Sequence, residues 1–115
     1  MVSPTVVKIA ELNDKFRRCD SSVPGMRFLT AGIIELLKRS NVDGDEIIKI
    51  VSEFNVFTEG NDPHGEHDFG TFEYLGETCF WKIDAYDNDY SMGSDDPTDL
   101  SRTKRILTVM LADEW

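Results

Sequence analysis

"TFEYLGETCFWKIDAY", residues 71–86, is the stretch that decides the fold. Two runs rich in aromatic and β-branched residues flank the turn Leu75-Gly76-Glu77, which predicts a β-hairpin. In the second run, the residues Cys79, Trp81, Ile83 and Ala85 alternate with Phe80, Lys82, Asp84 and Tyr86. Because successive side chains on a strand point to opposite faces, the first set is predicted to face the core. The second set contains both apolar and charged side chains and is predicted to be partly exposed to solvent.

Two helices are predicted before the hairpin. Ser3 as N-cap and Pro4 at the first helical position, followed by apolar residues at helical spacing, predict a helix over residues 4–18. Asp43 and Glu46 have the spacing of a capping box, in which a side-chain acceptor and a later acid satisfy free backbone N–H groups. The apolar stripe that follows them predicts a helix over residues 44–55.

The segment between these helices contains a turn and a short strand. "SSVPG" (21–25) is typical of a turn, and "MRFLT" (26–30) predicts a strand on which Met26 and Phe28 share a face. "AGIIELLKRSN" (31–41) is apolar enough for either the end of a strand or a short helix, and both alternatives stay open.

The C-terminal segment "LSRTKRILTVMLADEW" (100–115) also supports two interpretations. Leu100, Thr103, Leu107, Met110 and Leu111 have helical spacing, and Thr98 or Asp99 could cap such a helix. The alternation around Ile106, Thr108 and Met110 instead suits a strand. We favour the helix for residues 100–113.

These elements predict a single α+β domain over residues 1–115, with helices packed on one face of a small antiparallel sheet. No apolar run approaches the ~20 residues that cross a bilayer, and the N-terminus lacks the pattern of a secretory signal. We therefore expect a cytoplasmic protein with no membrane partner. In that reducing compartment, Cys19 and Cys79 are expected to be free thiols.

The negative charge is concentrated in one part of the chain. The net charge is −10, and residues 59–99 carry twelve acidic residues and a single basic one, Lys82. We expect Lys82 to pair with Asp84 or a neighbouring carboxylate. Such a segment repels nucleic acid and attracts basic proteins or cations, so direct nucleic-acid binding is disfavoured. Arg102, Lys104 and Arg105 form a small basic patch that we interpret as local counter-charge to the acidic loop.

The acidic segment also contains groups that could bind a metal ion. Asp62, His64, Glu66, His67 and Asp68 are chemically able to bind zinc, but "HGEH" (64–67) lies in a loop and lacks the HExxH spacing. "DNDYSMGSDDPTD" (87–99) begins like an EF-hand loop but has Met92 at the glycine position and Thr98 at position 12. We expect no metal and no cofactor.

Acid–base catalysis is the alternative that the histidines raise. His67 beside Asp68 would be a proton-transfer pair, and nearby carboxylates could assist it in a small enzyme or metal-dependent hydrolase. The sequence offers no obvious nucleophile with an oriented base. Cys79 is predicted to face the core, where a thiol is inert. No catalytic residue is therefore assigned.

Four motifs in order resemble the family catalogued as domain of unknown function 3768. They are "NDPHGEHDFG" (61–70), "FWKIDAYD" (80–87), "GSDDPTD" (93–99) and "RILTVMLADEW" (105–115), and the resemblance is firmest over residues 54–115. His64 stands where the family pattern has tyrosine. The resemblance brings no activity; it implies a small bacterial protein of the kind found on plasmids and other mobile elements.

An interaction surface is the function that we favour from the sequence. Residues 57–90 hold eight of the twelve aromatic residues, and aromatics flanked by carboxylates can anchor a basic partner. The expected partner-binding residues are Asp84, Tyr86, Asp87, Asp89, Tyr90, Asp95 and Asp96, with the two tyrosines exposed. Their spaced carboxylates could imitate a phosphate backbone and occupy a basic, nucleic-acid-binding surface of a host defence protein, as an anti-CRISPR or anti-restriction inhibitor does. A homodimeric regulator is a third alternative.

Overall fold

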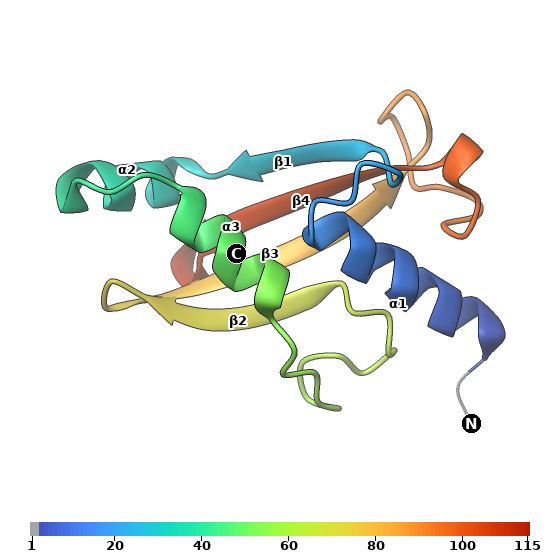
Figure 1. The fold of residues 1–115 in the computed structure, drawn as a ribbon, viewed down its shortest axis with the longest axis horizontal. Coiled ribbons are helices and arrows are strands. Elements are labelled where there is room, and N and C mark those ends of the chain that lie inside the picture. Colours follow the sequence, from blue (N-terminus) through green and yellow to red (C-terminus); the bar gives the residue numbers. More distant parts are fainter. Residues whose placement is uncertain (1–2) are drawn as a thin grey trace.

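The structure is a computed structural model that describes residues 3–115. In chain order, the elements are α1 (Pro4–Arg17), β1 (Gly25–Leu29), α2 (Ala31–Ser40), α3 (Asp45–Glu53), β2 (Phe69–Tyr74), β3 (Glu77–Tyr86), the 3-10 turn η1 (Leu100–Arg102), β4 (Lys104–Leu111) and the 3-10 turn η2 (Ala112–Glu114). The four strands form one sheet in the order β1-β4-β3-β2. Helices α1 and α3 lie on one face of this sheet, and α2 continues from the end of β1 (Figure 1).

The predicted α+β fold with helices on one face is confirmed, and so is the hairpin. β2 and β3 pair antiparallel from Phe69 opposite Lys82 to Tyr74 opposite Glu77. The sheet is mixed rather than wholly antiparallel, because β1 pairs parallel to β4. A parallel pair needs a long connection between its strands. Here α2, α3 and the β2–β3 hairpin supply that connection.

The core lies between the sheet and the helices, on the face that the alternation in β3 predicts. Cys79 and Trp81 are fully buried and Ile83 nearly so, while Phe80, Lys82 and Asp84 on the opposite face are partly exposed. The pKa of the Cys79 thiol is raised to about 11. Burial is the main cause, and the negative charges of Glu73 and Glu77 act in the same direction. The prediction that Cys79 is inert is consistent with this environment. Both cysteines are free.

The helix predicted for residues 100–113 is wrong, because this segment forms the strand β4. β4 is a central strand that pairs with β1 on one side and β3 on the other. Arg105, Leu107 and Val109 point into the core with period two, which is the alternation that suits a strand. Asp99 does act as an N-cap, as predicted, but of the short turn η1. Its carboxylate accepts a hydrogen bond from the Ser101 amide.

The start of α3 also differs from the prediction. Gly44 is the N-cap and makes no side-chain cap, so Asp43 and Glu46 do not form a capping box. Asp43 instead accepts a hydrogen bond from the Asp45 amide, and Glu46 accepts one from the Tyr74 hydroxyl at 3.2 Å. The ambiguous segment 31–41 is resolved as helix α2, whose N-cap Thr30 follows β1 directly.

Glu114 brings the C-terminal turn η2 to the N-terminus of α2. Its carboxylate accepts hydrogen bonds from the Thr30 hydroxyl at 2.6 Å, the Leu111 amide at 2.8 Å and the Gly32 amide at 3.0 Å. Burial acts to raise the pKa of Glu114, but these three bonds outweigh it and hold the pKa below its ordinary value. An anion at a helix N-terminus satisfies free N–H groups and complements the helix dipole.

We expect Glu114→Gln to lower the free energy of unfolding by about 1 kcal/mol at neutral pH, the usual contribution of a helix cap. A carboxylate whose pKa is lower in the folded state stabilises it above the unfolded pKa, and this stability is lost as the pH falls through the folded pKa. The difference from the wild type should therefore shrink steadily as the solution is acidified through the folded-state pKa. Urea unfolding at neutral pH and at an acidic pH below that pKa measures it, with Asp113→Asn as the matched control. An equal loss at both pH values would contradict the prediction.

Candidate functional site

Several carboxylates of the acidic loop 87–99 hold the loop itself in shape. The Asp87 carboxylate accepts hydrogen bonds from the amides of Asp89 and Ser91 at 3.1 and 3.0 Å, and from the Ser91 hydroxyl. Bonds from Ser91 are the main cause of the lowered pKa of Asp87. Asp96 accepts hydrogen bonds from the hydroxyl and amide of Thr98, and these likewise lower its pKa. Asp87 and Asp96 therefore have a structural role in this loop.

Other acidic residues of the predicted surface are free to meet a partner. Asp89 is exposed and makes no side-chain hydrogen bond or ion pair with residues 3–115. The Asp95 side chain is 92% exposed, and its Oδ2 atom lies 4.0 Å from the Arg102 guanidinium. Asp84 lies on β3 and forms the expected pair with Lys82, with Nζ and Oδ2 2.7 Å apart. Lys82 is therefore paired with Asp84, and Arg102 is the basic side chain beside Asp95.

Tyr86 and Tyr90 lie where β3 enters the acidic loop. Their ring centroids are 6.4 Å apart at an interplanar angle of 48°. Both side chains are half-buried, so the prediction that they are exposed holds only in part. The structure thus brings the two predicted anchors together at one end of the sheet, beside the free carboxylates of the loop.

The predicted basic patch is incomplete, because Arg105 is fully buried. Its Nε donates to the Asn13 side chain at 2.7 Å, and one terminal nitrogen donates to the Pro97 carbonyl at 2.8 Å. Burial lowers the pKa of this guanidinium. Arg105 joins α1, β4 and the acidic loop, and sequence reasoning missed this role because it treated the residue as a surface charge.

His67 is the centre of a second polar cluster. Its Nδ1 lies 3.1 and 3.0 Å from the two carboxylate oxygens of Asp14, and its Nε2 lies 3.7 Å from Asp62. The imidazole stacks on the Phe57 ring with centroids 3.9 Å apart and planes 3° apart. His67 also has a φ of 54°, which is uncommon for a residue other than glycine. The backbone and the side chain of His67 are thus both fixed by neighbouring groups.

The expected pairing of His67 with Asp68 does not form. Asp68 lies near the middle of α1, where it lines a small depression of about 180 Å³ together with Asn13, Glu66 and Asp84. Burial raises the pKa of both Glu66 and Asp68, and the charges of neighbouring carboxylates raise them further. Asp14, the actual partner of His67, comes from α1, which no local sequence pattern connects to the loop.

Within residues 3–115, no three histidine, cysteine, aspartate or glutamate side chains come together in an arrangement that could hold a metal ion. In the loop that begins like an EF-hand, the Asp87 oxygens already accept hydrogen bonds from the loop's own amides. In the same described range, no helix is long and apolar enough to cross a membrane.

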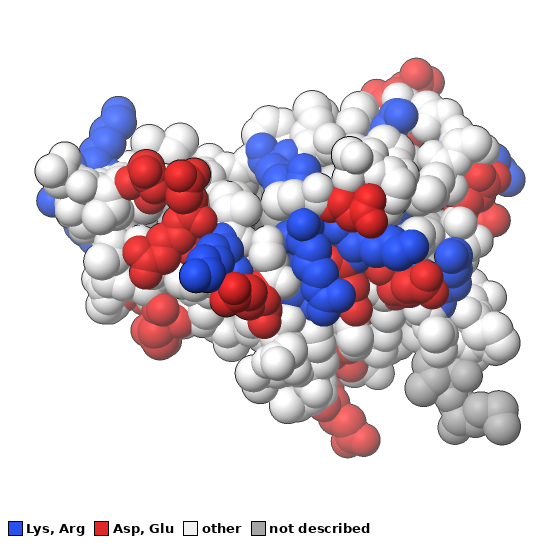
Figure 2. All heavy atoms as spheres, in the orientation of Figure 1, with Lys and Arg blue, Asp and Glu red and all other residues white. Residues whose placement is uncertain are grey.

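Acidic and basic side chains are interleaved on the face that the helices cover, and acidic side chains also lie where loop 87–99 leaves the sheet (Figure 2). Residues 29–114 match the model of the family described as protein of unknown function (DUF3768). The chain belongs to this family. No curated protein and no solved structure matches it.

The DUF3768 match confirms the resemblance on the motifs that carried it. It spans the hairpin, the acidic loop and β4, and it includes His67, Tyr86 and Tyr90. Helix α1, which supplies Asp14, lies before the matched range. The family description assigns no activity, so the function has to be argued from the arrangement of the side chains.

Proposed function

We propose that this DUF3768 protein is a cytoplasmic, non-enzymatic binding module that occludes a basic surface of another macromolecule. The observation that carries the proposal is the exposed negative charge of loop 87–99. The only basic residue of the acidic segment, Lys82, is paired with Asp84, while Asp89 and Asp95 project from the loop. Charges of one sign on an exposed surface steer a partner of opposite charge and fix its orientation.

The expected partner is a protein whose basic surface handles nucleic acid, such as a host defence complex. Duplex DNA carries one negative charge per ~1.7 Å of its axis, so a basic groove built for phosphates also accepts spaced carboxylates. If the protein is encoded on a mobile element, such an inhibitor would protect that element from host defence. The mobile-element origin is implied by the family resemblance alone.

An enzyme centred on His67 has less support. The Nδ1 atom faces Asp14 and the Nε2 atom faces Asp62, so both imidazole nitrogens are directed at groups of the protein itself. The ring is also covered on one face by Phe57. These contacts join α1 to the loop 54–68, which is a structural role.

The proposal predicts that Asp89→Asn/Asp95→Asn will weaken partner binding at least tenfold without lowering the melting temperature. Both side chains are exposed, whereas Asp87 and Asp96 hold the loop and are left intact. The measurement is a pull-down from a lysate of the source organism at low and moderate salt, with mass spectrometry and competition by added DNA. Glu35→Gln/Glu53→Gln removes the same charge from α2 and α3 and serves as the control. Equal retention by both double variants would refute the proposal.

A further inference from the structure

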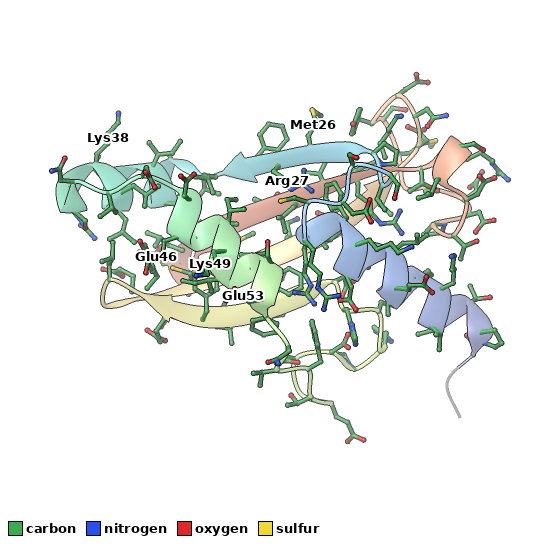
Figure 3. All side chains as sticks on the ribbon, viewed as in Figure 1. Met26, Arg27, Lys38, Glu46, Lys49 and Glu53 are labelled. Atoms are coloured by element: carbon green, nitrogen blue, oxygen red, sulfur yellow. The ribbon has the colours of Figure 1, made fainter. Side chains whose placement is uncertain are left out.

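The face of the sheet opposite the helices carries apolar side chains from all four strands, with the Lys82–Asp84 pair among them. On β1, Met26 and Phe28 are 40% and 49% exposed, and Met26 points away from Arg27, which turns toward α1 (Figure 3). In register, Met26 stands beside Ile106 and Phe28 beside Thr108 on the neighbouring strand β4. The three α-helices all contribute to the single core on the other side of the sheet. Residues 3–115 place no α-helix on this face.

The C-terminal residue makes this face concave. Trp115 is 70% exposed, and its ring lies edge-on to Phe69 and Phe80, with centroids 5.4 and 5.8 Å away. A groove of about 420 Å³ runs beside it; its walls are Thr30, Lys82, Thr108, Met110, Glu114 and Trp115. An exposed apolar surface with polar residues at its rim marks an interaction site.

The charges around this face define what it can bind. Inside the face, Lys82 and Asp84 neutralise each other at 2.7 Å. At the end where β3 finishes lies the acidic loop with Asp89 and Asp95. At the opposite end, Glu73 lies on the same face of β2 as Phe69 and pairs with Thr78. Asp113 lines a depression with Thr78, and both Glu73 and Asp113 are exposed. The apolar face is therefore bordered by negative charge at both ends.

We propose that this uncovered face binds a segment of a partner protein in which apolar side chains are flanked on both sides by lysine or arginine. The inference rests on the proposed function and names the part of the partner that is recognised. The apolar residues of the segment would cover Met26, Phe28 and Trp115, and its basic residues would meet the two acidic ends. β3 has ten residues and spans roughly 33 Å, so about ten extended residues reach from one end to the other.

A second copy of the chain fits this face less well. Each copy has a net charge of −10 and the same two acidic ends, so two faces brought together would repel one another. A basic segment gains attraction at both ends and buries the same apolar area.

The test is selection of peptides by the purified full chain from a random phage-displayed library, followed by affinity measurement on the synthesised winners by fluorescence anisotropy. We expect the selected peptides to combine aromatic or aliphatic residues with flanking lysine or arginine. Met26→Ser/Phe28→Ser should weaken their binding at least tenfold, because both side chains lie on the face and neither is needed in the core. Val56→Ser, an exposed apolar residue of the loop after α3, should leave binding unchanged.

Other outcomes overturn the inference. These are selected peptides without basic residues, no selected peptides, or equal binding by the double serine variant. The same holds for a wild-type dimer in sedimentation that the double serine variant converts to monomer, since the occupant would then be a second copy. If Asp89→Asn/Asp95→Asn weakens binding and the double serine variant does not, the proposed function stands without this face. If the double asparagine variant binds like the wild type, the proposed function itself fails.

Discussion

Gly70→Ala is expected to lower the free energy of unfolding by about 3 kcal/mol, at the upper end for overpacking a core. Gly70 pairs with Trp81 across the β2–β3 ladder, and the indole lies against its backbone. A Cβ added to Gly70 would lie 2.3 Å from Trp81 Nε1 and 2.7 Å from the Phe54 ring. Trp81 is fully buried, and the Phe54 and Phe57 rings pack edge-on against it, so the indole has no space to move into.

Urea unfolding followed by circular dichroism measures the effect of Gly70→Ala. The matched control is Gly60→Ala, because a Cβ at Gly60 would meet only the Thr58 hydroxyl at 3.7 Å, an ordinary contact. We expect this control to stay within about 0.5 kcal/mol of the wild type, as most surface changes do. Similar stability of the two alanine variants would show that the indole is not tightly held against β2.

The hairpin was predictable because both of its patterns are local. Glycine in the turn and strict alternation in residues 77–86 place Cys79, Trp81 and Ile83 in the core, as the structure confirms. β4 was not predictable to the same degree, because Leu107 and Met110 fit a helical stripe as well as a strand. Its pairing with both β1 and β3 decides the outcome, and these partners lie far away in the sequence.

The candidate surface shows the same division between local and long-range information. The acidity of loop 87–99 follows from composition, but only the structure separates Asp87 and Asp96, which accept hydrogen bonds within the loop, from the free Asp89 and Asp95. The shared face of Met26 and Phe28 was predictable from alternation. That this face lies opposite the helices, with Trp115 beside it, depends on the order of the strands.

The polar cluster around Asp14 escaped prediction because it joins three distant segments. Arg17 is 1% exposed and donates hydrogen bonds to the carbonyls of Val51 and Ser52 at 2.9 and 3.1 Å, and to Asp14 at 2.7 Å. These two carbonyls belong to the last turn of α3, and that turn contains no basic residue. The final carbonyls of a helix lack partners within the helix, so Arg17 supplies the donors that α3 needs.

Arg17→Met is therefore expected to lower the free energy of unfolding by about 3 kcal/mol, the scale for removing one partner of a buried charged pair. Methionine keeps much of the apolar stem of Arg17 but leaves two carbonyls of α3 without hydrogen-bond donors. Asp14 loses its partner Arg17 and retains its contact with His67. The guanidinium also lies over the rings of Phe57 and Trp81, at 5.3 and 5.5 Å, and these contacts are lost with the charge.

Arg17→Lys should recover little of the lost stability, because a single ammonium group cannot reach both carbonyls and Asp14 with the fixed geometry of the guanidinium fork. The control is Arg18→Met, which removes the same charge from an exposed neighbour and should change stability by no more than about 0.5 kcal/mol. Hydrogen exchange separates this mechanism from a general loss of packing. The amides of α3 should lose protection in Arg17→Met before those of β3 and β4 do, since the sheet keeps its own ladder. Uniform loss of protection, or equal stability of the Arg17 and Arg18 variants, would exclude Arg17 as the cap of α3.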